Sequence, residues 1–257
     1  MDVNERLETP AGHAAVLRTG IDGRQGRVLI VPPFGVEART LRFVADQLAR
    51  LGYETCLLDA RNHVGEGSGT IAEYRVSDVV DDCRNAIRRY EPTAVLGLSL
   101  GARALIRATA TSGLTPHAVL LIPVVDLRST LTAVLGRDLY TQAYVPEFHP
   151  VLGYRVRSKR VLDDALHHGL LTPESTAHDL AAHSGTTTLI PLDGDQWVDV
   201  QTVQRTAEHA QLQGAHITTT PMPGNEHELQ KDPEVALQIV AAAVAEIERL
   251  HQLQPAI

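Results

Sequence analysis

Long apolar runs are absent from this sequence, which has no stretch approaching the roughly 18 uninterrupted apolar residues that a membrane-spanning helix requires. The opening residues, MDVNERLETP, also lack the apolar segment of a signal peptide. We therefore expect a soluble, cytoplasmic protein without a membrane span.

Cysteine is scarce as well, since Cys56 and Cys83 stand alone and lack the CxxC spacing of metal or redox sites. We expect both thiols to be reduced and packed in the interior. Positive charge is in deficit, with a formal net charge of −8. This balance argues against a nucleic-acid partner, because phosphate binding depends on clustered lysine and arginine.

What is present is an alternation of β-rich runs with amphipathic helical stretches, which is typical of βαβ units and a mostly parallel sheet with helices on both faces. The apolar content of 44% is sufficient for one large core. The pattern predicts strands at 27–31, 54–59, 93–98, 117–122, 187–192 and 216–221, and helices at 38–51, 73–90, 100–112, 200–212 and 233–251.

The alternation stops between Asp126 and Ser184, where prolines and glycines break the chain into short helical pieces without a convincing strand. We interpret residues 126–184 as an inserted helical cap. The core would then consist of residues 1–125 and 185–257.

A G-x-S-x-G motif, Gly97-Leu98-Ser99-Leu100-Gly101, lies directly between a predicted strand and a predicted helix. In that context it predicts an α/β-hydrolase fold with Ser99 as the nucleophile, because the flanking glycines permit a sharp, strained turn. An inert serine in a Gly-flanked turn is the alternative. A dinucleotide-binding turn would need G-x-G-x-x-G in the first βαβ unit, which is absent, and no cofactor is expected.

The acid of a catalytic triad should follow the serine and precede the histidine in this fold. The loop after the strand near residue 190 offers three carboxylates, Asp193, Asp195 and Asp199. We expect Asp199 to cap the helix that begins at residue 200. Asp195 is the preferred acid, and Asp193 remains the alternative.

The base of the triad should lie in the last third of the chain. Of twelve histidines, His227 is the one in the loop between the last predicted strand and the last predicted helix. Its acidic neighbours do not complete the zinc motif HExxH, because position 231 is lysine, so no metal is expected.

Backbone N–H groups should hold the oxyanion that forms during attack. Leu100, which follows the nucleophile, is one candidate donor, and Phe34 or Gly35 is the other. Pro32 and Pro33 precede them and have no N–H to donate.

Further short motifs are distributed over about residues 28–250: Asn62-His63-Val64-Gly65, Ser68-Gly69, Ser99-Leu100, Ala102-Arg103, Val125-Asp126-Leu127-Arg128, Thr130-Leu131, Leu135-Gly136, Asp195-Gln196-Trp197-Val198 and His227 ahead of Leu229. In these motifs the chain resembles the acyl transferases of bacterial luminescence systems, also described as myristoyl-acyl-carrier-protein thioesterases. The Asp-x-Trp-Val and Val-x-Leu-Arg elements are much less generic than G-x-S-x-G.

The resemblance implies a triad of Ser99, Asp195 and His227, and so selects Asp195 over Asp193. It also implies a fatty-acyl thioester on acyl carrier protein as the substrate class. The chain departs from the family at Gly97 and Gly101, where the family carries other small residues, and at Pro33, which replaces a glycine. The glycines at 97 and 101 make the serine motif more similar to that of general hydrolases. The identity of the acyl chain and of its acceptor therefore stays open.

Two further sets of residues are candidates for substrate contacts. His63, after the second predicted strand, and Trp197, beside Asp195, are candidate substrate-binding residues, although turn formation explains the glycine-rich stretch around His63 equally well. A basic segment comprises Arg155, Arg157, Lys159 and Arg160. It could dock an acidic carrier protein or its phosphopantetheine phosphate, and a solvated face of the cap is the alternative.

The leading functional hypothesis is therefore cleavage or transfer of a medium-to-long acyl chain from a carrier-protein thioester through acyl-Ser99. A carboxylesterase acting on small free esters would use the same three residues. A non-catalytic binding module is a third possibility, which ordinarily shows a lost triad residue.

Overall fold

The structure is a computed structural model that describes residues 2–20 and 23–252. Its central sheet has eight strands in the order β1-β2-β4-β3-β5-β6-β9-β10. The bounds are β1 (Val3–Thr9), β2 (Gly12–Thr19), β3 (Gly26–Val31), β4 (Tyr53–Asp59), β5 (Ala94–Leu98), β6 (His117–Leu121), β9 (Thr186–Ile190) and β10 (His216–Thr219). The strands from β4 to β10 in this order are parallel, whereas β1 and β2 pair antiparallel at one edge.

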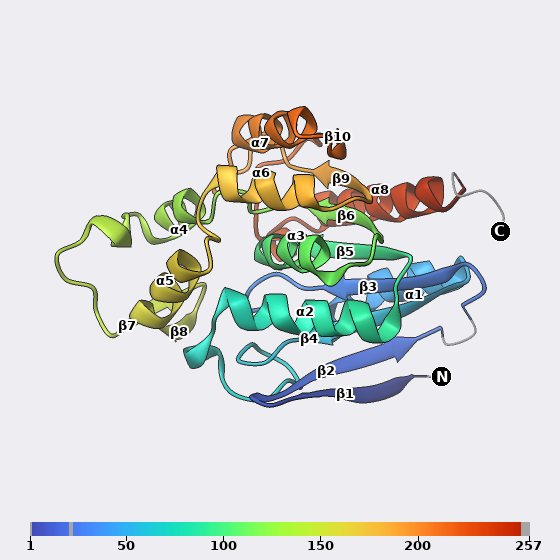
Figure 1. Ribbon diagram of the computed structural model, residues 1–257, viewed down its shortest axis with the longest axis horizontal. Coiled ribbons are helices and arrows are strands. Elements are labelled where there is room, and N and C mark those ends of the chain that lie inside the picture. Colours follow the sequence, from blue (N-terminus) through green and yellow to red (C-terminus); the bar gives the residue numbers. More distant parts are fainter. Residues whose placement is uncertain (1, 21–22, 253–257) are drawn as a thin grey trace.

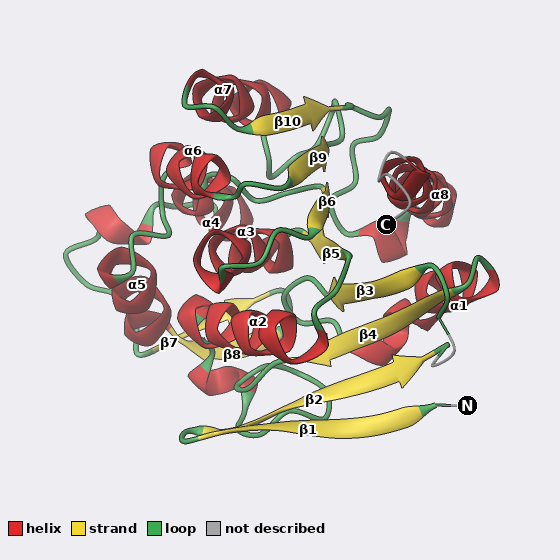
Figure 2. Ribbon diagram, turned by 45° about the vertical axis from the view of Figure 1, so that its right-hand side comes forward, coloured by secondary structure: helices red, strands yellow, loops and turns green. Residues whose placement is uncertain are grey.

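Helices cover both faces of this sheet (Figure 2), as the alternating sequence pattern predicts. One face carries α2 (Val76–Tyr90), α3 (Leu100–Ser112), α6 (Pro173–Ala182) and α7 (Val200–Leu212). The other carries α1 (Arg42–Arg50) and α8 (Pro233–Gln252). Successive strand residues point to opposite faces, so in β3 Leu29 and Val31 pack under α2 and α3 while Val28 and Ile30 pack under α1 and α8.

The helices form where apolar residues recur at helical spacing. In α2 the buried apolar residues form a single stripe against the sheet: Val76, Val79, Val80, Cys83, Ala86, Ile87 and Tyr90. Cys83 and Cys56 are both free and fully buried, which confirms the expected packing of the two thiols. In residues 2–20 and 23–252 no helix is both long and apolar enough to cross a membrane.

Most of residues 126–184 extend beyond the carboxyl ends of the parallel strands (Figure 1). They contain α4 (Leu127–Leu135), a strand pair β7 (Phe148–Val151) and β8 (Tyr154–Arg157), α5 (Ser158–His167) and α6. Short 3-10 helices complete the chain: η1 (Ala38–Leu41), η2 (Ile71–Glu73), η3 (Leu139–Thr141) and η4 (Leu229–Lys231).

The expectation that residues 126–184 contain no strand is wrong, because β7 and β8 form an antiparallel hairpin. Its two-residue turn, Leu152-Gly153, has positive φ at both residues (48° and 83°), the geometry of a type I′ turn. Such turns usually have the sequence Asn-Gly, and leucine rarely adopts a positive φ. Only the glycine of the usual pair is present here, so the sequence pattern does not predict the hairpin.

Helix α6 differs from the rest of the proposed cap because it packs against α3 and α7 on the sheet. The fully buried Arg103 of α3 donates to Asp179 of α6 at 2.8 Å, and Arg107 donates to the same carboxylate at 2.7 Å. The boundary between cap and core at residue 184 stays a prediction.

The antiparallel hairpin of β1 and β2 has no counterpart in the sequence prediction. Strand β1 lies at the sheet edge, where its side chains are alternately half-buried and exposed. Its sequence, VNERLET, is accordingly rich in charge rather than in apolar residues.

Candidate active site

Ser99 occupies the junction between β5 and α3, at the carboxyl end of a central strand. Its φ of 49° and ψ of −119° form a strained turn that a non-glycine residue seldom adopts. The backbone N–H of Ser99 donates to the carbonyl of Leu121 at 3.0 Å, and its carbonyl accepts from Val124 at 3.3 Å. These bonds to the β6 end fix the turn in the conformation that presents Oγ.

The two glycines of the motif are required by close backbone contacts. A Cβ on Gly97 would lie 2.8 Å from Cα of Ala102, and a Cβ on Gly101 would lie 2.2 Å from the carbonyl oxygen of Pro32. Neither backbone atom can move without displacing a helix or the loop after β3. These contacts are the steric reason for glycine on both sides of the sharp turn that the sequence predicts.

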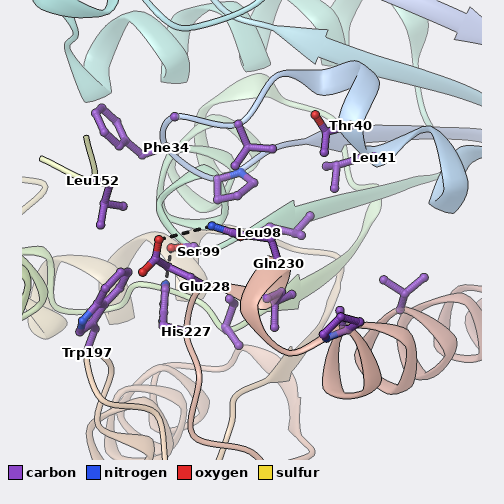
Figure 3. A pocket seen from close by; sticks show the side chains of 18 of the residues that line it. Phe34, Thr40, Leu41, Leu98, Ser99, Leu152, Trp197, His227, Glu228 and Gln230 are labelled. Carbon is purple, nitrogen blue, oxygen red and sulfur yellow. Dashed lines mark hydrogen bonds between the residues drawn. The ribbon is translucent and has the colours of Figure 1, made fainter. Parts of the chain in front are cut away.

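His227, Ser99 and Asp195 form one chain of hydrogen bonds. Nε2 of His227 lies 2.6 Å from Oγ of Ser99, and Nδ1 lies 2.6 Å from Oδ2 of Asp195. The side chains of His227 and Asp195 are only 4% and 1% exposed. Figure 3 shows His227 and Ser99 facing each other at the wall of the pocket. Three loops that follow β5, β9 and β10 thus bring the three side chains together.

The loop after β9 holds Asp195 in one orientation. Its second oxygen, Oδ1, accepts from the backbone N–H groups of Trp197 at 2.8 Å and Val198 at 3.0 Å. Oδ2 is thereby directed at the imidazole.

The other two carboxylates of this loop have different partners. Oδ1 of Asp193 accepts from the N–H of Gly224 at 3.2 Å, so this residue joins the loops after β9 and β10. Asp199 caps α7 by accepting from the N–H groups of Gln201 and Thr202, as expected. Of the two alternatives for the acid, the structure places Asp195 on His227.

The ring of Trp197 lies against the imidazole of His227, with centroids 4.8 Å apart and planes inclined by 38°. Figure 3 shows Trp197 beside His227, so that the indole ring covers one side of the imidazole. Trp197 also lines both cavities at Ser99, which is the location expected of a substrate-binding residue.

The candidate oxyanion donors differ in their present partners. Leu100 is the first residue of α3, so its N–H has no acceptor within the helix. The N–H of Gly35 donates to Nε2 of His63 at 3.0 Å, so this donor is already engaged. Of the pair Phe34 and Gly35, Phe34 is therefore the better candidate for the second donor.

His63 does not line either cavity, in contrast to the expectation that it lies at the pocket mouth. It is buried behind the loop after β3, where burial lowers the pKa of His63 to about 4. Because Nε2 accepts from Gly35, the proton of this neutral imidazole is on Nδ1. His63 supports the loop rather than the substrate.

Tyr154 and Asp59 were not identified from the sequence, yet both fix the loop after β3. The hydroxyl of Tyr154 in β8 donates to the carbonyl of Gly35 at 2.9 Å, across 119 residues of sequence. Asp59, at the end of β4, accepts from the N–H of Ala38 at 2.7 Å at the start of η1. No local pattern signals contacts of this range.

Two cavities open at Ser99. We call them the large cavity, of about 460 Å³, and the small cavity, of about 60 Å³. Both are bordered by Phe34, Ser99, Leu152, Trp197 and His227. The large cavity continues between η1, the start of α1 and the start of α8, whereas the small cavity continues toward α4, β8 and α5.

Most of the basic segment is engaged in local ion pairs. Arg157 and Arg160 each contact Glu73 at 2.6 Å, and Lys159 contacts Asp163 at 2.7 Å. The guanidinium of Arg155 lies 4.3 Å from the ring centroid of Phe148. The segment is exposed, but nearby carboxylates offset much of its charge.

In the part of the chain that the structure describes, no group of three or more histidine, cysteine or acidic side chains is arranged to hold a metal ion. The chemistry that the geometry supports is nucleophilic attack by a serine that is activated by an adjacent histidine.

Comparison with known proteins agrees with this geometry. An acyl transferase of Photobacterium leiognathi is 26% identical over 216 residues, which cover 80% of this chain and 67% of that protein. This match confirms the resemblance to acyl transferases noted from the sequence.

Solved structures share the fold at low sequence identity. A thioesterase domain from the curacin biosynthetic pathway has a TM-score of 0.64 at 15% identity, covering 96% of this chain and 99% of that one. The ferulic-acid-bound Est1E of Butyrivibrio proteoclasticus has a TM-score of 0.71 at 12% identity, covering 94% and 99%. Residues 28–244 match the alpha/beta hydrolase family. Because this match spans most of the sequence and the sheet order and serine turn agree with it, the chain belongs to the alpha/beta hydrolase family.

Proposed function

We propose that this protein is a serine acyl hydrolase or acyltransferase that removes a medium-to-long acyl chain from an acyl-carrier-protein thioester. The observation that carries the proposal is the continuous hydrogen-bonded chain from Asp195 through His227 to Ser99. A strained serine turn, a buried acid and a histidine between them are the parts of a nucleophilic acyl-transfer site.

In the first half-reaction Oγ of Ser99 attacks the thioester carbonyl carbon while its proton passes to Nε2 of His227. The carbonyl oxygen becomes an oxyanion, held by the N–H groups of Leu100 and Phe34. When the intermediate collapses, the C–S bond breaks and the thiol leaves with the proton from His227. The product is an ester of Ser99, and Asp195 stabilises the imidazolium in between.

In the second half-reaction His227 takes a proton from water or from another nucleophile, which attacks the acyl-Ser99 ester. When the second intermediate collapses, the bond between the acyl carbon and Oγ of Ser99 breaks, His227 returns the proton to Oγ, and an acid or a transferred acyl group is released. Because both half-reactions pass through the same atoms, the site geometry is equally suited to hydrolysis and to transfer.

The acyl part of the proposal is supported by the large cavity, which is mainly apolar and opens at Ser99. Its volume of about 460 Å³ falls in the range of pockets that bury organic ligands. The acyl transferase similarity supports the same substrate class. In this proposal residues 126–184 form the cap over a core of residues 1–125 and 185–257.

Docking of the carrier protein on the basic segment is a separate element of the proposal. Arg155 is the member without a carboxylate partner among the ion pairs described above, and Lys159 is 83% exposed. We expect Lys159→Glu to reduce kcat/KM for acyl-carrier-protein thioesters several-fold without changing turnover of an aryl ester. An unchanged kcat/KM for acyl-carrier-protein thioesters in Lys159→Glu would show that the carrier does not dock there.

Ester hydrolysis is the second candidate function. The favouring observation is that the large cavity opens to the surface past Phe43 and Leu237, which leaves room for a free ester without a carrier. A carboxylesterase would turn over soluble aryl esters well and ignore acyl-carrier thioesters.

The decisive experiment compares wild type with Ser99→Ala on acyl-carrier-protein thioesters, coenzyme A thioesters and aryl esters. We expect wild type to prefer the carrier thioester and to accumulate an acyl adduct on Ser99 detectable by mass spectrometry. Ser99→Ala should lose both. The control is Ser129→Ala on α4, whose hydroxyl contacts Asp126 and lines neither cavity. Turnover retained by Ser99→Ala would refute the proposed nucleophile.

A further inference from the structure

The two cavities that open at Ser99 differ greatly in size. The small cavity has a volume of about 60 Å³. The large cavity has a volume of about 460 Å³. Only the large one has room for an acyl chain of more than a few carbons.

Part of the wall of the large cavity belongs to the hydrophobic core. Its buried lining includes four aliphatic residues: Leu41 in η1, Leu98 in β5, Ile122 after β6 and Val240 in α8. These four side chains belong to the core that packs under α1 and α8. An alkyl chain that contacts them replaces water at a fully apolar surface.

The outer edge of the large cavity is formed by Phe43 and Leu237, which are 41% and 58% exposed. The polar side chains of the lining include Thr40, Glu228 and Gln230 (Figure 3). Gln230 donates to Glu228 at 3.3 Å, and Lys231 forms an ion pair with the same carboxylate. These polar side chains near His227 therefore have hydrogen-bond or ion-pair partners among themselves. The cavity is thus a groove with an apolar base and a partly polar edge.

The small cavity is bordered by the proposed cap, including Leu131 and Val134 of α4 and Val161 of α5. It reaches Leu100, the residue next to the nucleophile. Its volume admits the atoms adjacent to the reacting carbonyl and little more.

We propose that the acyl chain lies in the large cavity, between η1, α1 and α8, and that the small cavity under α4 takes only the few atoms nearest the reacting centre on the leaving-group or acceptor side. This inference rests on the proposed function and adds to it the location of chain-length selection. Selectivity for chain length is then set by α8 and η1 rather than by residues 126–184.

Ala236 provides the sharpest test because it is half-buried on α8 and lines the large cavity with the smallest side chain available there. Ala236→Trp should fill the groove. The matched control is Val134→Trp on α4, which is also half-buried on a helix but lines the small cavity. Both variants are assayed by kcat/KM on thioesters and aryl esters with acyl chains from two to fourteen carbons.

In wild type we expect kcat/KM to rise by roughly fourfold for each methylene until the groove is filled. Ala236→Trp should remove this rise, with at least a tenfold loss for chains of ten or more carbons and less than a threefold change for acetyl substrates. Val134→Trp should lower kcat/KM by a similar factor at every chain length. Acetyl turnover reports that each variant is folded and has a working Ser99.

A second variant avoids the core altogether. Leu237→Asp places a carboxylate at the exposed edge of the groove and should lower kcat/KM for long chains at least tenfold while acetyl turnover is retained. If chain-length preference is unchanged in Ala236→Trp and Leu237→Asp but altered in Val134→Trp, the inference is wrong and the proposed function stands. Wild type that turns over no acyl substrate of any length overturns the proposed function itself.

Discussion

The orientation of Asp195 leads to a specific prediction for the substitution Asp195→Asn. Oδ1 of Asp195 accepts two backbone N–H bonds, from Trp197 and Val198, so an acceptor is required at that position. The amide oxygen of asparagine must therefore occupy it. The amide nitrogen is then forced into the place of Oδ2, facing Nδ1 of His227.

An amide N–H at that place reverses the hydrogen bond to His227. Nδ1 must accept instead of donate, so the imidazole proton moves to Nε2, which faces Oγ of Ser99 at 2.6 Å. Nε2 can then no longer take the serine proton. In the serine-protease triad the equivalent change lowers kcat by about 10⁴-fold, or about 5.4 kcal/mol of transition-state stabilisation.

We expect Asp195→Asn to lower kcat by about 10³- to 10⁴-fold, with little change in KM or in the melting temperature, because the two side chains have the same shape. Steady-state kinetics on an aryl ester and thermal unfolding measure these quantities. Asp193→Asn is the matched control, because Asp193 bonds Gly224 rather than His227 and an asparagine oxygen can still accept that bond. A large loss in Asp193→Asn together with near-normal kcat in Asp195→Asn would refute the assignment of the acid.

Three further substitutions test the supports of the site. Gly101→Ala should destabilise the fold by about 1–3 kcal/mol and lower kcat, because its Cβ would meet the Pro32 carbonyl at 2.2 Å. His63→Gln should make the free energy of unfolding less sensitive to acid. The pKa of the buried, neutral His63 is about 4, against about 6.5 in the unfolded chain, so its contribution to stability is complete above pH 6.5 and falls as the pH decreases. By pH 5 the wild type should have lost about 2 kcal/mol of this contribution. Arg103→Met should cost about 3 kcal/mol, because it leaves the buried Asp179 with one cation fewer. Urea unfolding at pH 7 and pH 5 measures the three changes in stability, and steady-state kinetics on an aryl ester measures kcat of Gly101→Ala.

Each of these three predictions has a control or an opposing outcome. Gly113→Ala at the end of α3 has no atom within 4 Å of the added Cβ and should cost less than Gly101→Ala, despite its positive φ. Arg107→Ala, at a partly exposed position, should cost less than Arg103→Met. An unchanged difference in stability between pH 7 and pH 5 in His63→Gln would contradict the buried neutral state of His63.

The parts of the site that the sequence predicts are those with a local cause. Gly97 and Gly101 are neighbours of Ser99, and the chain order of acid and histidine in this fold directs attention to two short loops. The choice between Asp193 and Asp195 could not be made from spacing, because both lie in one loop. The structure separates them through the N–H groups of Trp197 and Val198, which turn Asp195 toward His227.

The parts that the sequence does not predict depend on partners far along the chain. Arg157 and Arg160 look like a free basic patch in the sequence, but Glu73, more than 80 residues away, pairs with both. His63 looks like a pocket residue because it follows a strand at the correct edge. Its partner is the N–H of Gly35, whose position is set by tertiary packing and not by local sequence.

These distant contacts converge on the loop after β3. Its Gly35 is held by His63 from the loop after β4 and by Tyr154 from the hairpin of residues 126–184, while Asp59 holds the start of η1 just beyond it. This loop provides one candidate oxyanion donor and also borders the large cavity. The same loop therefore positions the candidate oxyanion donor and part of the wall of the proposed acyl groove. Because Tyr154 holds this loop, we expect substitutions of Tyr154 to alter kcat and chain-length preference together. Substitutions of Ala236 or Leu237 lie on the opposite wall and should alter chain-length preference alone.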